Sequence, residues 1–531
     1  MNIKTLFITA LSIVFITTLH AQEVNMVLER GVGEADGFRD DAEVIGSVEN
    51  SILILDGEDL VLSNGLESGT KIVGNLGTNG RIIHGRALLN SKLYFIIDND
   101  DEEFQLMELD PDSETLNTLL SGYNIISNIV AYDNKIYCSA ESANSNDAFI
   151  SIDPSDLSIQ EIFELNSFGG MRDAVVHDDL IYTIHWTTTA ANGAYLSRTN
   201  GTPGNVDEFH FFHNGSEFSQ TADINMTSAG DNLYMWYNDG SHDYSLIVSD
   251  GTNAGTITLT DLLEPLPFDD FDRDRKIGIL GNNILFLGRD RATNNRELWI
   301  SDGTVEGTRK RRMSSGVRVN PQFFTSYMDQ LYFYGASEDE SFFDVCVSDG
   351  TFDGTNLLFD PSGLFFTGWH LVQHNDRLFF SAVNSSNKGD LYAHEGTEAS
   401  LEMISDLAPG SNNSRLFNLH SAGENLFFLG DTGTQGIELY VYGSQMSDVI
   451  ELNKATTLIY PNPAIDYLNL SNFELEIGSV IIYDINSQIV DKFLTTNEIV
   501  SIRDLLPGFY TLTFKNHKKT ITSKFIKVSN Y

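Results

Sequence analysis

The sequence predicts an all-β protein: a β-propeller of eight or nine four-stranded blades, followed by a small Ig-like β-sandwich. Three observations support this prediction. One string recurs along most of the chain, a shorter aromatic string precedes each copy, and both have the composition of strands. After residue 451 these strings stop and a different strand pattern begins. We therefore expect a signal peptide over 1–21, a propeller over 22–451 and a C-terminal domain over 452–531.

The first residues have the pattern of an export signal. Lys4 supplies a positive charge, residues 6–19 form an apolar run, and Ala21 is a small residue suited to cleavage. The run is too short for a membrane-spanning helix, and no later segment reaches that length. We expect a mature chain that starts near Gln22, has no transmembrane segment and is secreted or held at the outer-membrane surface.

The charge balance excludes one class of partner. The 531 residues include 32 Lys and Arg against 75 Asp and Glu, a formal net charge of -43. Such a field repels nucleic acid and anionic lipid headgroups, so neither is an expected partner. A strongly acidic surface also keeps a protein soluble, which is the simpler explanation of the imbalance.

The recurring string is "ELWISDGTVEGT" at residues 297–308. Close copies are "SLIVSDGTNAGT" from Ser245 and "DVCVSDGTFDGT" from Asp344, and weaker copies extend in both directions. The copies begin at Asp59, Gln105, Ala148, Tyr195, Ser245, Glu297, Asp344, Asp390 and Glu438. A period of 43 to 52 residues indicates a solenoid, an array or a propeller.

The second string is typified by "KLYFII" from Lys92 and "QLYFYG" from Gln330. It predicts the second of four strands in each unit, and the recurring string predicts the third. Four-stranded antiparallel units without helices favour a propeller, whose ring leaves only short edges. Nine units exceed the usual four to eight blades, so the blade number stays at eight or nine. Residues 24–29 are predicted to add a strand that closes the ring onto the last unit.

The tetrapeptide "SDGT" is predicted to be a tight turn between the third and fourth strands. Two-residue hairpins of the mirror-image type need positive φ, which Asp-Gly tolerates. The predicted turn residues are Asp250, Gly251, Asp302, Gly303, Asp349 and Gly350, and we interpret them as structural rather than ligand-binding.

Trp299 is predicted to pack between neighbouring sheets rather than to stack on a ligand. Its slot is filled in other units by Val61, Met107, Ile247, Cys346, Tyr392 and Tyr440. The second cysteine, Cys138, falls in a different slot of a non-neighbouring unit. We therefore predict two free, buried thiols rather than a disulfide, although export would permit one.

The copies "ELWISDGTVEGT", "SLIVSDGTNAGT" and "DVCVSDGTFDGT" resemble the ELWxxDGT repeats of exported bacterial proteins. Similar units cover about residues 43–452. The resemblance implies a propeller and does not imply a reaction.

The C-terminal segment differs from the propeller in charge, because acidic and basic residues are equal in number from Glu451 onward. Its strings "YPNPAIDYLNL", "IIYDINSQIV" and "LLPGFYTLTF" and its basic end resemble the sorting domain recognised by the type IX secretion system of Bacteroidetes-type bacteria. The matching motif residues are Pro461, Asn462, Pro463, Gly508 and Tyr510. The resemblance implies a partner, the type IX machinery, and passage through the outer membrane, after which such tails are often removed. A plain accessory sandwich is the alternative.

The sequence assembles no catalytic site. Asp98, Asp100 and Glu102 alternate as in calcium loops, so calcium is a possible cofactor, but the glycine and distal glutamate of an EF-hand are absent. A solvated hairpin tip is the alternative for these residues.

The histidine pairs and the one basic run are weaker candidates. His210 and His213 fall on opposite faces of a strand, and His370 and His374 are too far apart along one for a shared zinc ion. The basic run at 308–313 is expected to protect an exposed edge strand, or to contact anionic polysaccharide.

Three hypotheses for function follow. The first is a secreted or cell-surface propeller that acts as a binding, adhesion or scaffold module, with a glycan or surface protein as its ligand. The second is an extracellular enzyme acting on polysaccharide or peptide, favoured by His, Tyr, Arg or carboxylates from several blades at one channel mouth. The third is a structural surface-layer component, favoured by a bland mouth and an apolar rim.

Overall fold

In the computed structural model the chain forms two compact units, Met1–Gln445 and Met446–Tyr531. In the first unit the structure describes residues 23–28, 38–39, 41–78, 80–98, 104–141, 147–165, 170–187, 193–213, 225–238, 244–264, 277–290, 295–311, 320–336, 343–351, 353–358, 364–365, 371–384, 389–396, 400–405, 414–432 and 436–443. In the second it describes residues 459–460, 464, 467–470, 478–483, 489–495, 499–503, 505–506, 508–515 and 520–528.

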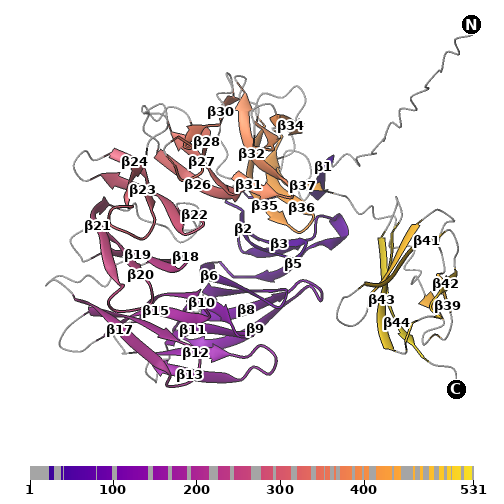
Figure 1. The fold of residues 1–531 in the computed structure, drawn as a ribbon, viewed down its shortest axis with the longest axis horizontal. Coiled ribbons are helices and arrows are strands. Elements are labelled where there is room, and N and C mark those ends of the chain that lie inside the picture. The colour runs from indigo at the N-terminus through magenta and orange to yellow at the C-terminus, as the bar shows by residue number, and fades with distance from the viewer. Residues whose placement is uncertain are drawn as a thin grey trace, which may run out of the picture. The chain divides into compact units, whose positions relative to one another are not determined.

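The first unit is a β-propeller whose four-stranded antiparallel blades follow one another around a ring (Figure 1). Blade 1 has β2 (Glu43–Val48), β3 (Ser51–Asp56), β4 (Asp59–Ser63) and β5 (Thr70–Asn75), with a 3-10 turn η1 (Glu67–Gly69). Blade 2 has β6 (Arg81–Leu89), β7 (Lys92–Asp98), β8 (Phe104–Asp110) and β9 (Thr115–Tyr123). Blade 3 has β10 (Ile125–Tyr132), β11 (Lys135–Glu141), β12 (Ala148–Ile152) and β13 (Ile159–Glu164).

Blades 4 to 6 continue the same order. Blade 4 has β14 (Met171–His177), β15 (Leu180–Thr187), β16 (Gly193–Thr199) and β17 (Val206–His213). Blade 5 has β18 (Asn225–Ala229), β19 (Asn232–Asn238), β20 (Tyr244–Ser249) and β21 (Ile257–Glu264). Blade 6 has β22 (Ile277–Leu280), β23 (Asn283–Asp290), β24 (Asn295–Ser301) and β25 (Arg309–Arg311).

Blades 7 to 9 complete the ring. Blade 7 has β26 (Asn320–Tyr327), β27 (Gln330–Ala336), β28 (Phe343–Ser348) and β29 (Asn356–Leu357). Blade 8 has β31 (Leu371–His374), β32 (Arg377–Asn384), β33 (Gly389–His394) and β34 (Glu402–Ser405), with β30 (Leu364–Phe365) beside β32. Blade 9 has β35 (Arg415–Ala422), β36 (Asn425–Asp431), β37 (Ile437–Gly443) and β1 (Glu23–Leu28). The described strands therefore form nine blades, within the predicted range.

The ring is closed by the N-terminal strand. β1 pairs antiparallel with β37 and becomes the fourth strand of blade 9. Val27 lies in a core cluster that combines Ile52 of blade 1 with Phe427 of blade 9. The Asn418 side chain also donates to the Ala42 carbonyl oxygen across this junction at 2.7 Å. The prediction that residues 24–29 close the ring onto the last unit is confirmed for residues 24–28, and residue 29 lies outside the described residues.

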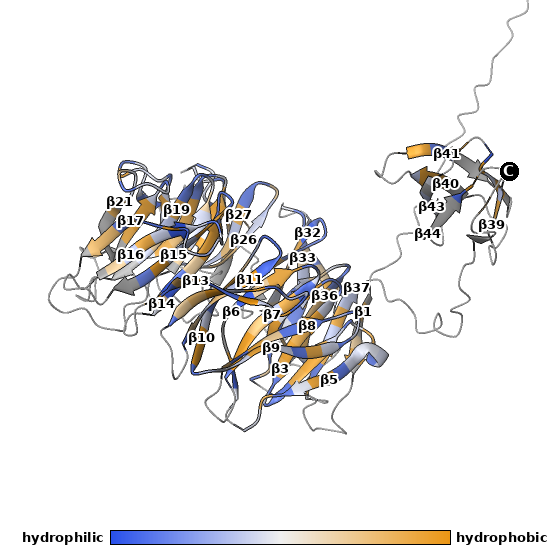
Figure 2. Cartoon of the chain, turned by 90° about the horizontal axis from the view of Figure 1, so that it is seen from below, coloured by the Kyte–Doolittle hydropathy of each residue, from blue (hydrophilic) through white to orange (hydrophobic). Residues whose placement is uncertain are grey.

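The interior lies between and within the blades. Second and third strands are almost completely buried, and β33 and β37 are buried at every position. One cluster joins Trp236 of blade 5 to Phe286 and Trp299 of blade 6, so aromatic side chains hold adjacent sheets together. Figure 2 shows the apolar colour along the strands of the ring and the polar colour concentrated in its turns.

Strand direction places two sets of connections on one face of the ring. First strands of neighbouring blades contact one another, as β6 does β10, so they surround the centre. Because the four strands alternate in direction, the first-to-second and third-to-fourth connections lie at the same edge of each blade. We call these the inner turns and the outer loops.

The second unit contains two small sheets. One has β38 (Ile459–Tyr460), β39 (Tyr467–Leu470) and β42 (Ile499–Ser501), and the other has β40 (Gly478–Tyr483), β41 (Ile489–Thr495), β43 (Gly508–Lys515) and β44 (Thr520–Lys527). Their shared core includes Leu468, Val480, Val500 and Leu512. The second unit is therefore all-β, as predicted, while its Ig-like topology stays a prediction.

Both cysteines are free and buried, as predicted. Cys346 lies opposite Phe333 in blade 7, and Cys138 lies opposite Ile150 in blade 3. Burial raises the pKa of the Cys138 thiol to about 12, which keeps it protonated and unreactive.

Candidate functional site

The outer loops differ from the turn that the sequence suggested. β24 ends at Ser301 and β25 begins at Arg309, so the connection is a seven-residue loop rather than a two-residue hairpin. Gly303 has a φ of 86°, but Asp302 is not among the residues with positive φ. The prediction of a mirror-image turn at Asp302-Gly303 is therefore wrong.

Side chains of the repeat hold this loop together. Asp302 Oδ1 accepts hydrogen bonds from the backbone N–H and the hydroxyl of Thr304, at 2.9 and 2.7 Å. The Thr304 hydroxyl oxygen accepts from the Gly307 N–H, and Ser301 and Thr308 join their hydroxyls at 2.8 Å across the loop base. The same bonds recur at Asp250 and Asp349. These side-chain hydrogen bonds to the backbone stabilise a longer loop in place of the two-residue hairpin that Asp-Gly predicts.

Where an outer loop contains the repeat glycine, as in blades 4 to 8, that glycine docks on the preceding blade. A Cβ atom on Gly201 would lie 2.2 Å from the Tyr137 hydroxyl, and one on Gly251 would lie 2.5 Å from the Tyr182 hydroxyl. At Gly303 the nearest atom is Nδ2 of Asn232, at 2.8 Å. The glycine is required by its positive φ and by this close approach. The repeat is thus a joint between blades.

One copy of the joint uses a histidine. In blade 8 the loop string is "HEGT", and His394 Nδ1 accepts the Gly396 N–H at 2.9 Å, where Ser301 Oγ accepts the Gly303 N–H in blade 6. Burial, with the nearby charge of Arg377, lowers the pKa of His394 to about 4. This joint therefore depends on a neutral imidazole.

Trp299 lies where blade 5 meets blade 6, and only 6% of its surface is exposed. The Lys310 ammonium lies 5.9 Å from the centre of its ring, and β25, which carries Lys310, is the last strand of its sheet path. Arg311 donates to the Gly350 carbonyl oxygen of blade 7 at 3.1 Å. The described part of the basic run is thus an edge strand. Its Lys310 side chain contacts Trp299, and its Arg311 side chain contacts the next blade.

The inner turns are the two-residue hairpins of this protein. The central pairs are Glu49-Asn50, Asn90-Ser91, Asp133-Asn134, Asp178-Asp179, Gly230-Asp231, Gly281-Asn282, Met328-Asp329, Asn375-Asp376 and Gly423-Glu424. Where both residues have positive φ, as at Asp133 and Asn134, the turn is of the mirror-image type. All eighteen positions are exposed. Unlike the outer loops of blades 5, 6 and 7, these turns vary from blade to blade.

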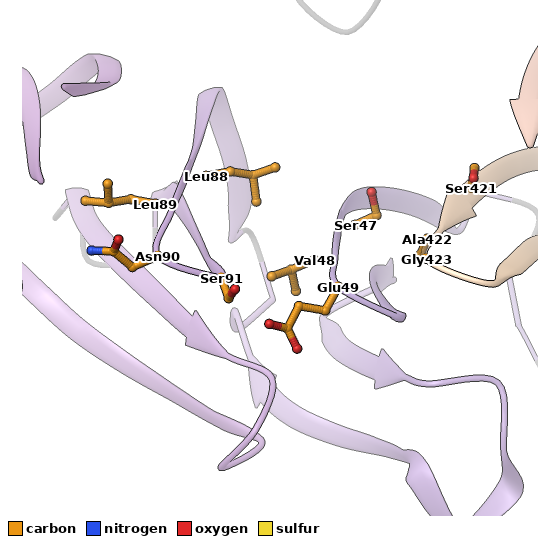
Figure 3. Close-up of a pocket in the computed structure, with 10 residues that line it drawn as sticks. All are labelled: Ser47, Val48, Glu49, Leu88, Leu89, Asn90, Ser91, Ser421, Ala422 and Gly423. Atoms are coloured by element: carbon orange, nitrogen blue, oxygen red, sulfur yellow. The ribbon is translucent and has the colours of Figure 1, made fainter. Parts of the chain in front are cut away.

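A pocket of about 350 Å³ lies among the inner turns of three consecutive blades (Figure 3). Its lining comes from residues 47–49 of blade 1, 88–91 of blade 2 and 421–423 of blade 9. Ring closure brings these segments together, although they are far apart in the sequence. The volume is at the lower end of the range for small-ligand sites.

The pocket wall combines polar groups with apolar side chains, of which Leu88 is the most exposed. Glu49 supplies a carboxylate, Asn90 an amide, and Ser47 and Ser91 hydroxyls. Leu88 is 60% exposed in the same wall. The fifth polar side chain, Ser421, already shares a hydrogen bond with His374 Nδ1 at 2.9 Å.

Two of the pocket residues have unusual backbone conformations. Glu49 and Ser91 have φ values of 52° and 59°, a left-handed region that Gly, Asn and Asp occupy at most other inner turns. A residue other than these pays in free energy to remain there. Such strain is a reason to look for a function at the position where it occurs.

The predicted calcium residues are only partly described. Asp98 ends β7, and its carboxylate accepts a hydrogen bond from Arg81 Nε at 2.9 Å. Asp100 and Glu102 lie outside the described residues. Across the described part of the chain, no three His, Cys, Asp or Glu side chains are arranged to hold a metal ion.

The structure describes the side chain of one histidine in each pair. His210 shares a hydrogen bond with Asn253 Oδ1 at 2.7 Å, and His374 is buried against Ser421 of the next blade. His370 lies outside the described residues.

In the second unit, Tyr510 packs against the shared core and donates its hydroxyl to the Leu506 carbonyl oxygen at 2.8 Å. Gly508 begins β43 and pairs with Lys527. Pro461, Asn462 and Pro463 lie outside the described residues.

Sequence reasoning missed the pocket. Two of its segments, 88–91 and 421–423, lie just before aromatic strings, so their place in turns could have been read from the repeat. Glu49 and Ser91 differ from the Gly, Asn and Asp that predominate at equivalent positions, and this deviation was the available signal.

The second unit matches a known family. Residues 458–528 match the secretion system C-terminal sorting domain, which covers the tail and not the propeller. This domain is the type IX sorting tail, so the chain is marked for secretion or for the cell surface. None of the helices among the described residues is long and apolar enough to cross a membrane.

No curated protein matches the sequence. Among solved structures, a prolyl endopeptidase aligns with 13% identity and a TM-score of 0.38, over 66% of this chain and 53% of that one. The propeller domain of the Trilobed protease from Pyrococcus furiosus aligns with 9% identity and a TM-score of 0.34, over 62% and 98%. PorZ of Porphyromonas gingivalis, a surface component of its type IX secretion system, aligns with 11% identity and a TM-score of 0.19, over 93% and 87%.

The chain covers little more than half of the prolyl endopeptidase structure and 58% of a puromycin hydrolase structure. With all of these TM-scores below 0.5, none of the likenesses bears on activity. The propeller follows from the order of the sheets themselves.

Proposed function

We propose that this protein is a binding or scaffold module of the cell exterior, exported through the type IX secretion system by its C-terminal domain. The observation that carries the export step is the sorting-domain match over residues 458–528. The mature propeller then acts as the passenger, with a glycan or a surface protein as its ligand.

Binding is supported by the face that carries the inner turns. Turns from three blades meet around one pocket, and loops that converge at a propeller mouth are common ligand sites. The pocket lining has a single carboxylate and contains no His, Tyr, Arg or Cys. That set can orient a ligand, but it offers no nucleophile with an adjacent base.

A structural surface-layer role is the second candidate, and a different observation favours it. Exposed apolar side chains occur on fourth strands around the rim, as at Ile72, Ile159, Ile257 and Met403. These side chains are distributed singly, and single exposed apolar residues are normal on soluble proteins. We therefore rank this role below binding.

The export step is tested in the native bacterium by comparing the full chain with a chain that lacks residues 458–528. The full chain is expected at the surface or in the medium, and the shortened chain in the periplasm. Surface exposure of the shortened chain would contradict the proposed route.

Binding is tested on the purified mature chain by thermal unfolding with millimolar calcium and with a panel of surface glycans. A native-state ligand raises the midpoint by mass action. A midpoint unaffected by every compound would favour the structural role instead.

A further inference from the structure

We propose that the pocket between the inner turns of blades 9, 1 and 2 binds one neutral sugar residue at the end of a glycan. This inference rests on the proposed binding function and assigns its site.

The charge of the pocket selects against acidic ligands. Glu49 is the only ionisable side chain in the lining, and the neighbouring inner turn of blade 9 adds Glu424. Under the field of a chain with a net charge of -43, a uronic acid or a phosphate would be repelled. A neutral polyol avoids this repulsion.

The polar groups match the hydrogen-bonding capacity of a sugar. Adjacent sugar hydroxyls can donate to the Glu49 carboxylate, while the Asn90 amide and the Ser47 and Ser91 hydroxyls both donate and accept. Bonds to the carboxylate are charge-assisted and therefore stronger than neutral ones. Leu88, at 60% exposure, offers an apolar surface to the C–H face of the ring.

The backbone sets Glu49 apart from most other inner-turn residues. Its φ of 52° would suit Asn, which occupies the same position in the turns of blades 2 and 8 at Asn90 and Asn375. Glu49 instead places a carboxylate in the pocket lining, in a backbone conformation that destabilises the turn.

Because Asn suits the backbone at position 49 better than Glu does, a substitution there can remove the carboxylate without destabilising the fold. Glu49→Asn removes the carboxylate and relieves the strained turn, so the variant is expected to unfold at an equal or higher temperature. Asp133→Asn is the matched control, since it makes a similar charge change in the equivalent turn of blade 3, outside the pocket. A loss of binding in Glu49→Asn alone cannot then be due to unfolding or to net charge.

The experiment is saturation-transfer NMR on the full mature chain. The probes are methyl glycosides of glucose, galactose and mannose, N-acetylglucosamine, glucuronic acid and spermidine. We expect at least one neutral sugar to bind saturably and glucuronic acid to bind at least tenfold more weakly. Glu49→Asn should weaken the neutral sugar about tenfold or more, whereas Asp133→Asn should leave it unchanged.

Three results would overturn the assignment. Sugar binding that survives both Glu49→Asn and Ser91→Asn would leave the binding function intact and place its site elsewhere. Binding of spermidine without any neutral sugar would reduce the pocket to a cation contact. If no probe binds, the pocket is not a sugar site. The export experiment would still decide whether the protein is a surface module.

Discussion

The outer loops and the inner turns lie on the same face of the ring, yet they differ in how far their side chains are repeated between blades. In the outer loops of blades 5, 6 and 7 the same side chains make the same bonds, as Asp250, Asp302 and Asp349 do. In the inner turns the backbone shape recurs, and the carbonyl oxygens of Asp179, Asn282 and Asp376 accept tyrosine hydroxyls of the preceding blade, but the side chains change from blade to blade. Repeated side chains therefore mark the outer joints, whereas inner turns contact the neighbouring blade largely through backbone oxygens and their side chains can vary.

The outer loops thus hold neighbouring blades together, and the side chains of the inner turns are available for binding. A joint has to fit the preceding blade, so its first glycine and its acceptors are fixed by contact with a neighbour such as Tyr137. A two-residue turn needs a tolerated backbone conformation and, at Asp179 and Asp376, a carbonyl oxygen placed for the tyrosine of the preceding blade, while its exposed side chains make few demands on the fold. Substitutions in the two regions should have correspondingly different effects on stability.

The largest effect is expected at a glycine that docks on a neighbouring blade. Gly201→Ala forces a left-handed alanine against the Tyr137 ring and should lower the free energy of unfolding by about 4 kcal/mol. Gly204→Ala, in the same loop, also places alanine at a positive φ but meets no atom within 4 Å. It should lose only about 1 kcal/mol. Urea denaturation of both variants measures the difference, and equal losses would show that the docking contact contributes nothing.

The second effect concerns acid sensitivity at the histidine joint. The pKa of His394 is about 4 in the folded chain and about 6.5 when unfolded. The unfolded chain binds the proton first, so the contribution of His394 to stability is complete above pH 6.5 and falls as the pH drops toward 4. Between pH 6.5 and 4 the free energy of unfolding should decrease by about 3 kcal/mol because of His394. His394→Ser installs the residue of the other joints, and should remove this part of the pH dependence.

Thermal unfolding of wild type and His394→Ser between pH 7.5 and 4 provides the measurement. The relevant quantity is the change with pH, because loss of the imidazole ring also alters packing at every pH. Parallel curves for the two proteins would contradict the role of the neutral imidazole.

The repeat predicted more of the fold than of the site. Its period fixed the four-stranded units, the burial of Trp299 and the closing strand near Val24, because these follow from apolar spacing and from edge pairing. The turn at Asp302 was predicted wrongly. Its conformation depends on bonds from Thr304 and on the hydroxyl of Thr308, which a rule based on two central residues ignores.

The pocket could not be predicted, because its walls meet only when the ring closes. Residues 47–49 and 421–423 are separated by almost the whole propeller and become neighbours at the junction of blades 9 and 1. Nothing in the local pattern of either segment specifies the other. Only the deviation of Glu49 and Ser91 from the usual turn residues was visible in advance.

A smaller effect is expected where a joint loses one acceptor. Asp302→Ala removes the partner of the Thr304 N–H and hydroxyl, and should lower the free energy of unfolding by about 1 to 2 kcal/mol. Asp302→Asn keeps an acceptor oxygen, as Asn200 does in blade 4, and should lose less. Urea midpoints of the two variants measure this, and equal losses would mean that the charge, not the acceptor, matters.

The smallest effect should have the opposite sign and occur in an inner turn outside the pocket. Met328 has a φ of 48°, is 63% exposed and lies outside the pocket. Its strained backbone should therefore lower the stability of the fold without contributing to binding there. Met328→Asn should raise the free energy of unfolding by about 0.5 to 1 kcal/mol, since Asn tolerates this conformation. Urea denaturation measures the gain, with Asp329→Asn as the control that should change stability by less than about 0.5 kcal/mol. A loss in Met328→Asn would show that the side chains of the inner turns also stabilise the fold, and the division between the two regions would fail. A gain without any effect on sugar binding would instead set Met328 apart from Glu49, where the same substitution also removes a carboxylate and is expected to weaken binding.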